Sequence, residues 1–287
     1  MQQPILKISA LYIYPIKSLG GISLRTARLT DRGFAYDRTW MLVDADNRFL
    51  TQRELPPMTF LKVELQEDGL FIQHKHTEDS IKIPFQPTGD MCTVTVWEDT
   101  CQAQFVSKEA DEWFSRTLSL PCRLVYMPEN TRRKVDTNYA HEDEITSFSD
   151  GFPLLMIGQA SLDDLNSRLA TPITMERFRP NIVFTGGAPF QEDEMAAFVI
   201  ADNDIRFYAV KPCARCVITT IDLATAEKGK EPLATLSRYR RQGNKIFFGQ
   251  NLLFDNSTNP HSISVGDRIT LLQTQPPAIA EKDNKPG

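Results

Sequence analysis

Short stretches in which apolar and polar residues alternate recur through the first 127 residues, and turn-forming residues separate them. Alternation with a period of two places one face of a strand against a core. The stretches that show it are residues 6–14, 38–43, 60–65, 70–74, 81–85, 93–97, 103–106 and 122–127. Their regular spacing predicts an antiparallel sheet or a barrel-like β module.

Helical periodicity is limited to three short segments. Residues 109–118 place three apolar side chains on one face, as a helix packed on a core does. Ser161 is expected to be the N-cap of a second helix, because an acidic first turn and a leucine stripe follow it. Pro232 suits the first turn of a third helix, which is expected to run to about residue 240.

The second half of the chain also contains apolar runs of strand length. They cover residues 182–184, 204–211, 217–221 and 262–272, and the last is interrupted by a turn at Gly266-Asp267. Together with the few short helices, these runs predict a mixed α/β fold that is predominantly β.

A polar and charged stretch at residues 127–144 separates the two halves and is expected to be a long surface loop at a domain junction. We therefore predict an N-terminal β-rich domain at residues 1–125 and a second domain at residues 126–273. Residues 274–287 are rich in Pro, Lys and Asp, have little to bury, and are expected to be a linker or a disordered tail.

Composition excludes several classes of function. The chain has 287 residues, of which 41% are hydrophobic and 24% charged, as in soluble globular proteins. A net charge of −5 does not indicate the basic surface that general nucleic-acid binding needs. No apolar run approaches the roughly 20 residues that span a bilayer, and the N-terminus lacks the features of a signal peptide. Five cysteines without framework spacing fit a reducing compartment, so we expect a cytoplasmic location.

Two of the five cysteines, Cys213 and Cys216, lie at a turn that is expected after Pro212, with Lys211 and Arg215 beside them. Cationic neighbours favour the thiolate, which is the form that acts as nucleophile and metal ligand. Half of a zinc ribbon would need a second cysteine pair. A thioredoxin-type pair would open a helix, whereas a β-rich run follows here. Spacing alone favours a structural turn over a chemical site.

Basic residues also mark the ends of other predicted strands. Lys17-Ser18, followed by two glycines, could form an anion cradle from backbone N–H groups, a hydroxyl and an ammonium, although a plain turn explains these residues as well. Arg38 can aim a planar fork at a phosphate or carboxylate, or it can pair with Asp37 or Asp31.

Two arginines and an asparagine, Arg177, Arg179 and Asn181, lie directly before the strand at 182–184. Buried arginines need anions, which could be protein carboxylates or a phosphorylated cofactor. The basic run at residues 132–134 is instead expected to lie on a solvated loop.

Eight short motifs occur in the order in which one known family carries them. They are Tyr14-Pro15-Ile16-Lys17-Ser18, Tyr36-Asp37-Arg38, Ser149-Asp150-Gly151-Phe152-Pro153, Ala160-Ser161-Leu162, Phe178-Arg179-Pro180-Asn181, Lys211-Pro212-Cys213-Ala214-Arg215-Cys216, Glu231-Pro232-Leu233 and Phe248-Gly249-Gln250-Asn251. With them the chain resembles MOSC-domain proteins of the YcbX and mitochondrial amidoxime-reducing type over about residues 4–273. The resemblance implies a MOSC β-barrel domain that follows an N-terminal β-rich MOSC-associated domain.

The resemblance also implies that the chain binds a molybdopterin-type molybdenum cofactor (Moco) and reduces N-hydroxylated compounds: hydroxylamines, N-hydroxylated purine bases and amidoximes. Cys216 matches the cysteine that supplies a thiolate, a soft ligand, to molybdenum. Asp150 matches an aspartate near the metal, and we hypothesise that it is catalytic and relays protons. The other positions that match cofactor-holding residues are Lys17, Ser18, Arg38, Ser149, Arg179, Asn181, Arg215 and Asn251.

Two questions stay open. MOSC modules also occur in cofactor sulfurases, so Cys216 could carry a persulfide and the chain could be a carrier of Moco or sulfur. Proteins of the YcbX type continue into a ferredoxin-like [2Fe–2S] module, whereas this sequence ends at Gly287 and its cysteines lack cluster spacing. We therefore expect a ferredoxin-like or flavoprotein electron donor, on a separate chain or in a further C-terminal module.

Overall fold

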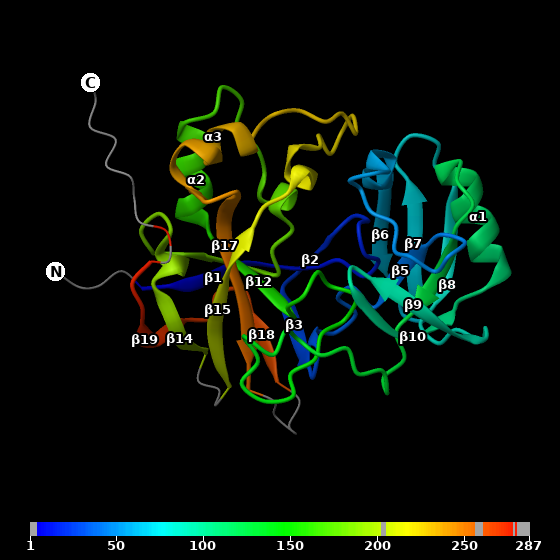
Figure 1. Ribbon diagram of the computed structural model, residues 1–287, viewed down its shortest axis with the longest axis horizontal. Coiled ribbons are helices and arrows are strands. Elements are labelled where there is room, and N and C mark those ends of the chain that lie inside the picture. The colour runs from blue at the N-terminus through cyan, green and yellow to red at the C-terminus, as the bar shows by residue number, and fades with distance from the viewer. Residues whose placement is uncertain (1–4, 202–204, 256–260, 278, 280–287) are drawn as a thin grey trace.

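Two lobes of β-structure lie side by side in the protein (Figure 1). The computed structural model describes residues 5–201, 205–255, 261–277 and 279. Strands dominate both lobes, and helices are short and few within the described ranges. The prediction of a mixed α/β, predominantly β fold is confirmed.

The larger lobe is built on a nine-stranded sheet. Its strand order is β19 (Ile269–Thr274), β14 (Met195–Ile200), β15 (Arg206–Ala214), β17 (Lys245–Phe254), β12 (Leu154–Gly158), β13 (Ile182–Thr185), β1 (Lys7–Ile13) and β2 (Ile22–Leu24), with β16 (Arg241–Gln242) paired to β17. β12 and β13 are parallel, and the other neighbours along this order are antiparallel. A three-stranded sheet of β18 (Ser262–Ser264), β3 (Thr26–Thr30) and β4 (Gly33–Phe34) shares its apolar core.

The smaller lobe contains two antiparallel sheets. One has the order β5 (Trp40–Val43), β11 (Arg123–Tyr126), β10 (Asp99–Phe105) and β9 (Met91–Val96). The other has β6 (Leu61–Leu65), β7 (Gly69–His74) and β8 (Ser80–Pro84). Apolar side chains of both sheets and of helix α1 (Lys108–Leu118) form one buried cluster. The short strands predicted from alternation before residue 127 are therefore present.

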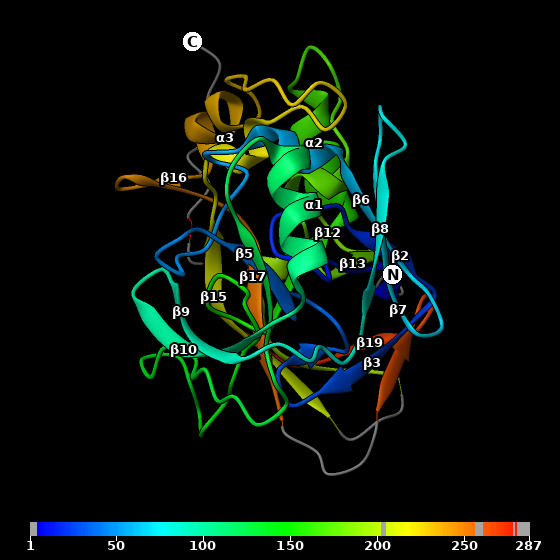
Figure 2. The same ribbon diagram turned by 90° about the vertical axis from the view of Figure 1, so that its right-hand side faces the viewer.

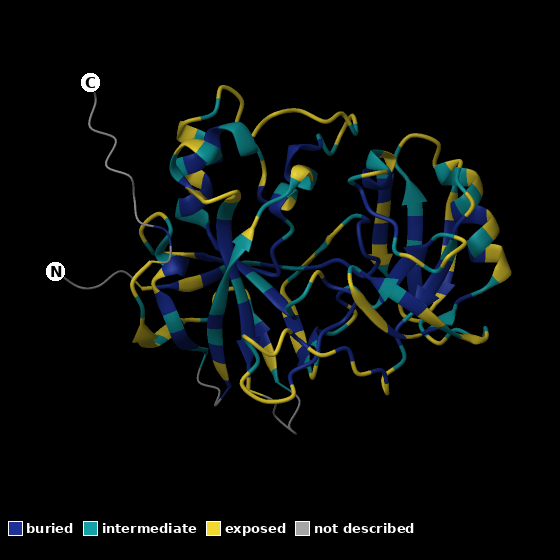
Figure 3. Ribbon diagram, viewed as in Figure 1, coloured by how far each residue is buried: buried dark blue, intermediate teal, exposed yellow. Residues whose placement is uncertain are grey.

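The remaining helices lie in the larger lobe, except for one short turn. Helices α2 (Gln159–Ser167) and α3 (Leu233–Tyr239) lie together at one end of that lobe in two perpendicular views (Figures 1 and 2). The 3-10 turns are η1 (Pro56–Phe60) in the smaller lobe and η2 (Met175–Phe178), η3 (Gln191–Asp193) and η4 (Val217–Thr220) in the larger. Buried residues concentrate along the strands of both lobes, while the loops around them are exposed (Figure 3).

Chain order and spatial order differ at the N-terminus. β1 pairs with β13 and β2, so residues from the start of the chain belong to the sheet that the second half builds. The division into domains at residues 1–125 and 126–273 stays a prediction. The pairing of β1 with β13 shows that the first strands belong to the sheet of the second half of the chain. Asp204, where one strand was expected to begin, and most of the predicted tail at 274–287 lie outside the described residues.

Two predictions around the cysteine motif are wrong. β15 does not end at Pro212 but continues to Ala214, with an irregular register opposite β17 that accommodates a residue without an N–H. The run after Cys216 is not a strand but the 3-10 turn η4. The hydroxyls of Thr219 and Thr220 donate to the carbonyls three residues earlier, at 3.0 and 2.8 Å, and such local bonds compete with a strand ladder.

Gly249 brings β17 unusually close to β12. Its φ is +83°, and a Cβ there would lie 2.6 Å from Ile157 Cγ1 and 2.9 Å from the Met156 carbonyl oxygen. A side chain is therefore excluded. This close approach fixes the position of Asn251, two residues further along β17.

A buried polar cluster joins η3 to α2 and β17. The carboxylate of Asp193 accepts hydrogen bonds from Arg240 and from Gln250 Nε2, the latter at 2.8 Å. Ser161 Oγ donates to Glu192 Oε2 at 2.8 Å. The predicted N-cap role of Ser161 is wrong, because Gly158 occupies the N-cap position. Burial, followed by the neighbouring Asp193, raises the pKa of Glu192 to about 7.

This pKa predicts a dependence of stability on pH. The folded protein retains a proton on Glu192 between about pH 4.5 and pH 7 that the unfolded chain releases, so this group lowers the free energy of unfolding as pH rises through that window, by about 3 kcal/mol in full. Glu192→Gln should remove this loss. Urea unfolding at pH 5, 6, 7 and 8 measures it, with exposed Glu194→Gln as control, and parallel pH profiles for Glu192→Gln and wild type would contradict the assignment.

Candidate functional site

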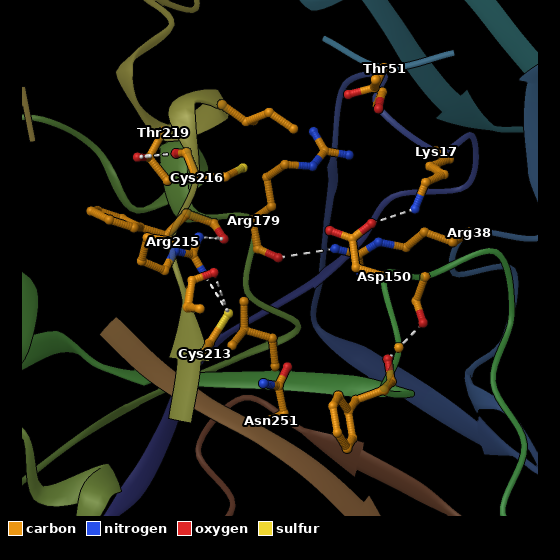
Figure 4. A pocket seen from close by; sticks show the side chains of 18 of the residues that line it. Lys17, Arg38, Thr51, Asp150, Arg179, Cys213, Arg215, Cys216, Thr219 and Asn251 are labelled. Carbon is orange, nitrogen blue, oxygen red and sulfur yellow. Dashed lines mark hydrogen bonds and ion pairs between the residues drawn. The ribbon is translucent and has the colours of Figure 1, made fainter. Parts of the chain in front are cut away.

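One cavity, partly open to solvent, is lined by all the candidate residues, and the empty space at its site, open solvent included, is about 870 Å³. The ten that line it are Lys17, Ser18, Arg38, Ser149, Asp150, Arg179, Asn181, Arg215, Cys216 and Asn251. They come from both halves of the sequence and from both lobes. Figure 4 shows the cysteine-bearing wall on one side, Lys17 and Asp150 on the opposite side, and the Arg179 side chain between them.

The lining of the cavity is strongly cationic, although the chain as a whole carries a net charge of −5. Its basic residues are Lys17, Arg38, Arg53, Arg177, Arg179 and Arg215. Asp150 is the one carboxylate among the lining residues. Guanidinium groups gathered in a concave site favour an anionic ligand, in particular phosphate, which matches their planar fork.

Two of these guanidinium groups share one aromatic ring. The Cζ atoms of Arg38 and Arg179 lie 4.3 and 4.1 Å from the centre of the buried Tyr14 ring. Arg38 donates to both oxygens of Asp37, at 2.8 and 2.6 Å. Arg179 donates to the Leu19 carbonyl at 2.7 Å, and its buried Nη2 has no partner among the described residues. Burial, followed by repulsion from Arg38, lowers the pKa of Arg179 to about 10.

The backbone is strained where this cationic cluster is held. Ser18, Arg38 and Arg179 have φ angles of 68°, 47° and 56°, in the left-handed region that residues with a side chain seldom adopt. Backbone hydrogen bonds fix the two arginines there, from Arg38 N to the Tyr14 carbonyl at 2.9 Å and from Arg179 N to the Glu176 carbonyl at 3.2 Å. Strain of this kind concentrates at ligand sites, where it points side chains in a required direction.

Lys17 and Asp150 form an ion pair on the opposite wall. Lys17 Nζ lies 2.6 Å from Asp150 Oδ1 and donates to the Phe148 carbonyl at 2.8 Å. The Trp97 indole N–H donates to the same Oδ1 at 3.2 Å. Desolvation within the cavity raises the pKa of Asp150, although its side chain faces the open space. The charge and hydrogen bond of Lys17, together with Trp97, outweigh this effect and hold that pKa well below its usual range. Asp150 is therefore an anion at neutral pH and stores no proton itself.

The cysteine wall differs from the sequence expectation in one respect. Arg215 Nη1 donates to Cys213 Sγ at 2.9 Å, and Nη2 donates to the Phe178 carbonyl. Lys211 was expected beside the cysteines, but its Nζ lies 4.2 Å from the centre of the Tyr139 ring. Cys216 is half-buried, occupies the N-cap position directly before η4, and lines the cavity.

Three predicted cofactor-binding residues use their polar groups within the protein. Asn181 Oδ1 accepts from Arg38 Nη1 at 3.2 Å and from Leu155 N at 3.1 Å. Ser149 Oγ donates to the Phe152 carbonyl at 2.7 Å, which stabilises its own turn. Asn251 Nδ2 donates to a β15 carbonyl at 3.1 Å. These contacts position the cavity walls, and contact of the three residues with a cofactor stays a prediction.

Residues that sequence reasoning missed also line the cavity. Thr51 and Arg53 follow β5, and Trp97, expected at the end of a strand at 93–97, lies at the turn between β9 and β10. Arg133 was expected on a solvated loop, but it is buried and donates to the carbonyls of Ser147 and Ser149, at 2.9 and 2.7 Å. The sequence TRRKV at 131–135 does not distinguish Arg133 from its two basic neighbours, and the alternating burial of this segment is a feature of the fold.

Comparison with known proteins shows which families and relatives the chain is similar to. The family model described as MOSC N-terminal beta barrel domain matches residues 5–121, and that described as MOSC domain matches residues 143–270. Mitochondrial amidoxime-reducing component 1 of Mus musculus is 32% identical over 290 residues, which cover 94% of this chain and 83% of that protein. The human protein of the same name is 31% identical, with 94% and 84% covered.

Molybdenum cofactor sulfurase of Oryza sativa subsp. japonica is 29% identical over 282 residues, which cover 91% of this chain and 34% of the sulfurase. In the described part of the chain, no helix has both the length and the apolar character needed to cross a membrane. The two domain matches and the relatives that align along nearly the whole chain show that it belongs to the MOSC family, with a MOSC N-terminal domain followed by a MOSC domain.

Proposed function

We propose that this protein binds Moco in the cationic cavity and reduces N-hydroxylated compounds there. The observation that carries the proposal is the convergence of a cysteine wall and a cationic wall on one cavity. The mouse and human relatives, named as amidoxime-reducing components, are matched over more than four fifths of their length.

The residues of the cavity fit the cofactor. Arg179 Nη2, Arg53 Nε and Arg215 Nε are buried donors without an acceptor among the described residues, and a bound phosphate would relieve such a deficit. Lys17, Arg38 and Arg179 would hold the anionic part of the cofactor, and Cys216 Sγ would be the protein ligand of molybdenum. When bound, Moco supplies the two-electron redox chemistry.

The overall reaction is R–NHOH + 2e⁻ + 2H⁺ → R–NH₂ + H₂O, in which the N–O bond breaks and its oxygen leaves as water. The electrons come from a donor protein, of ferredoxin or flavoprotein type. Lys17 Nζ is the proton-bearing group of the Lys17–Asp150 pair, and burial lowers the pKa of this lysine. The 68% exposed Asp150 side chain links Lys17 to the open cavity, so the proposed proton relay begins at Lys17 and passes through Asp150.

A second candidate function is that of a carrier of Moco or sulfur through a persulfide on Cys216. The matches to molybdenum cofactor sulfurases favour it. The chain spans about a third of these sulfurases, so their named activity belongs to much longer proteins. Reductase activity with an artificial electron donor distinguishes the two candidates, because a carrier has none.

Cys216→Ala is expected to lower reduction of a hydroxylamine substrate at least about 100-fold, because even outer-shell partners of a metal ligand cost 10–100-fold when lost. Steady-state turnover per folded chain measures the effect. Cys92→Ala, a half-buried cysteine outside the cavity lining, is the matched control and should keep wild-type activity. Normal turnover by the Cys216 variant would refute its assignment as the metal ligand.

Arg179→Ala should lower cofactor occupancy about tenfold or more at limiting cofactor, since a hydrogen bond to a charged group is worth about 1.5–3 kcal/mol. Arg179→Lys restores a point charge without the planar fork and should recover part of the occupancy. Molybdenum and pterin per chain measure both. Full occupancy in Arg179→Ala and in Arg38→Ala would show that these arginines do not hold the cofactor.

A further inference from the structure

The smaller lobe contributes Trp97 and Arg53 to the cavity wall, and no contact with the substrate has been assigned to either residue. Trp97 is half-buried at the turn between β9 and β10, and its ring lies 4.1 Å from the Arg53 guanidinium. Both residues line the same cavity as Cys216. The guanidinium lies over the indole ring as a cation–π pair, and both groups contribute to the cavity wall.

The indole is held in one orientation. Its Nε1 donates to Asp150 Oδ1 at 3.2 Å, and the Phe49 ring packs against it with centres 4.8 Å apart. Trp97 also has a φ of 58°, a strained conformation for a bulky residue. A ring fixed by a hydrogen bond, a stacked cation and a packed neighbour is preorganised as a contact surface, because it loses little freedom when a ligand binds.

The chemistry around the ring specifies the ligand. Arg53 Nε is buried and has no partner among the described residues. Asp150 carries a negative charge next to the indole, and its side chain is 68% exposed. This surface favours a planar, conjugated group that has both an acceptor for Arg53 Nε–H and an N–H donor for Asp150, as amidoximes and N-hydroxylated aminopurines do, over a purely aliphatic one.

We propose that Trp97, stacked on Arg53, is the specificity-determining platform for the substrate, on which the planar ring of an N-hydroxylated amidine or aminopurine lies. The inference rests on the proposed function and deepens it. The planar pterin of the cofactor has related chemistry. The substrate is the better occupant, because Arg38 and Arg179, stacked on Tyr14, draw the anionic cofactor to their own part of the cavity, whereas Asp150 beside the indole can accept from an N–H donor of a neutral amidine.

The test compares two substrates with the same reacting group, benzamidoxime, which has an aromatic ring, and acetamidoxime, which has none. Trp97→Leu should raise the KM for benzamidoxime about tenfold, as expected for loss of one ring-stacking contact. The KM for acetamidoxime, which has no ring to stack, should stay unchanged, and any fall in kcat from the lost indole hydrogen bond to Asp150 should be the same for both substrates. Trp97→Phe keeps a ring and should retain most of the benzamidoxime affinity.

Phe105→Leu is the matched control. Phe105 is also half-buried in the smaller lobe, packs on the same apolar cluster and lies 4.0 Å from a guanidinium, that of Arg123, but it does not line the cavity. This variant shows whether general loosening of the lobe changes catalysis. It should leave the KM and kcat for both amidoximes unchanged.

A binding readout separates failure of the platform from failure of the proposed function. Calorimetric titration with benzamidine, the reduction product of benzamidoxime, needs no turnover and should show about tenfold weaker binding in Trp97→Leu than in wild type. If wild type reduces neither amidoxime, this difference still supports the platform. Four results would overturn the platform. Two are binding results: equal benzamidine binding by both proteins, or no binding by wild type. The others are an equal change in the KM for both amidoximes, or loss of molybdenum and pterin from Trp97→Leu.

Discussion

The site depends on one electrostatic constraint: two guanidinium groups are held on the same buried ring with one carboxylate close by. Arg38 and Arg179 both contact Tyr14, and Asp37 pairs with Arg38. Like charges at this separation repel, and burial adds to the cost, as the lowered pKa of Arg179 reflects. Both arginines have strained backbone conformations with positive φ, and these conformations direct their side chains onto the ring. An anionic ligand bound between the two guanidinium groups would offset their repulsion, and this explains why the fold keeps them together.

The same constraint accounts for the architecture around the cavity. Tyr14 follows β1 and Arg179 precedes β13, and these two strands are neighbours in the large sheet, so the pairing of distant segments brings the cations together. The smaller lobe supplies Arg53 and Trp97, and β15 with η4 supplies the cysteines. Neither lobe contains the complete site, and the junction between them is where its chemistry resides.

Residue types alone indicate candidates for anion binding at Lys17, Ser18, Arg38, Arg179 and Asn181, because cationic and polar groups at strand ends need partners. The choice of Ser149, Asp150 and Asn251, and the role of Cys216, depend on the family resemblance. The ten candidate residues do line one cavity. Contacts that depend on three dimensions were not accessible. Lys211 is sequence-adjacent to the cysteines yet contacts Tyr139, and Ser161 resembles a cap yet binds Glu192. Trp97 belongs to no motif, and the fold alone brings its indole to Asp150.

The most direct test of the account is native mass spectrometry with metal analysis of the wild-type protein, purified from cells whose Moco supply is verified with a second molybdoenzyme. The account predicts a bound mass that contains molybdenum and a pterin phosphate, at one per folded chain. Folded protein that carries neither molybdenum nor pterin from such cells would contradict it, because the cationic cavity would then have some other purpose.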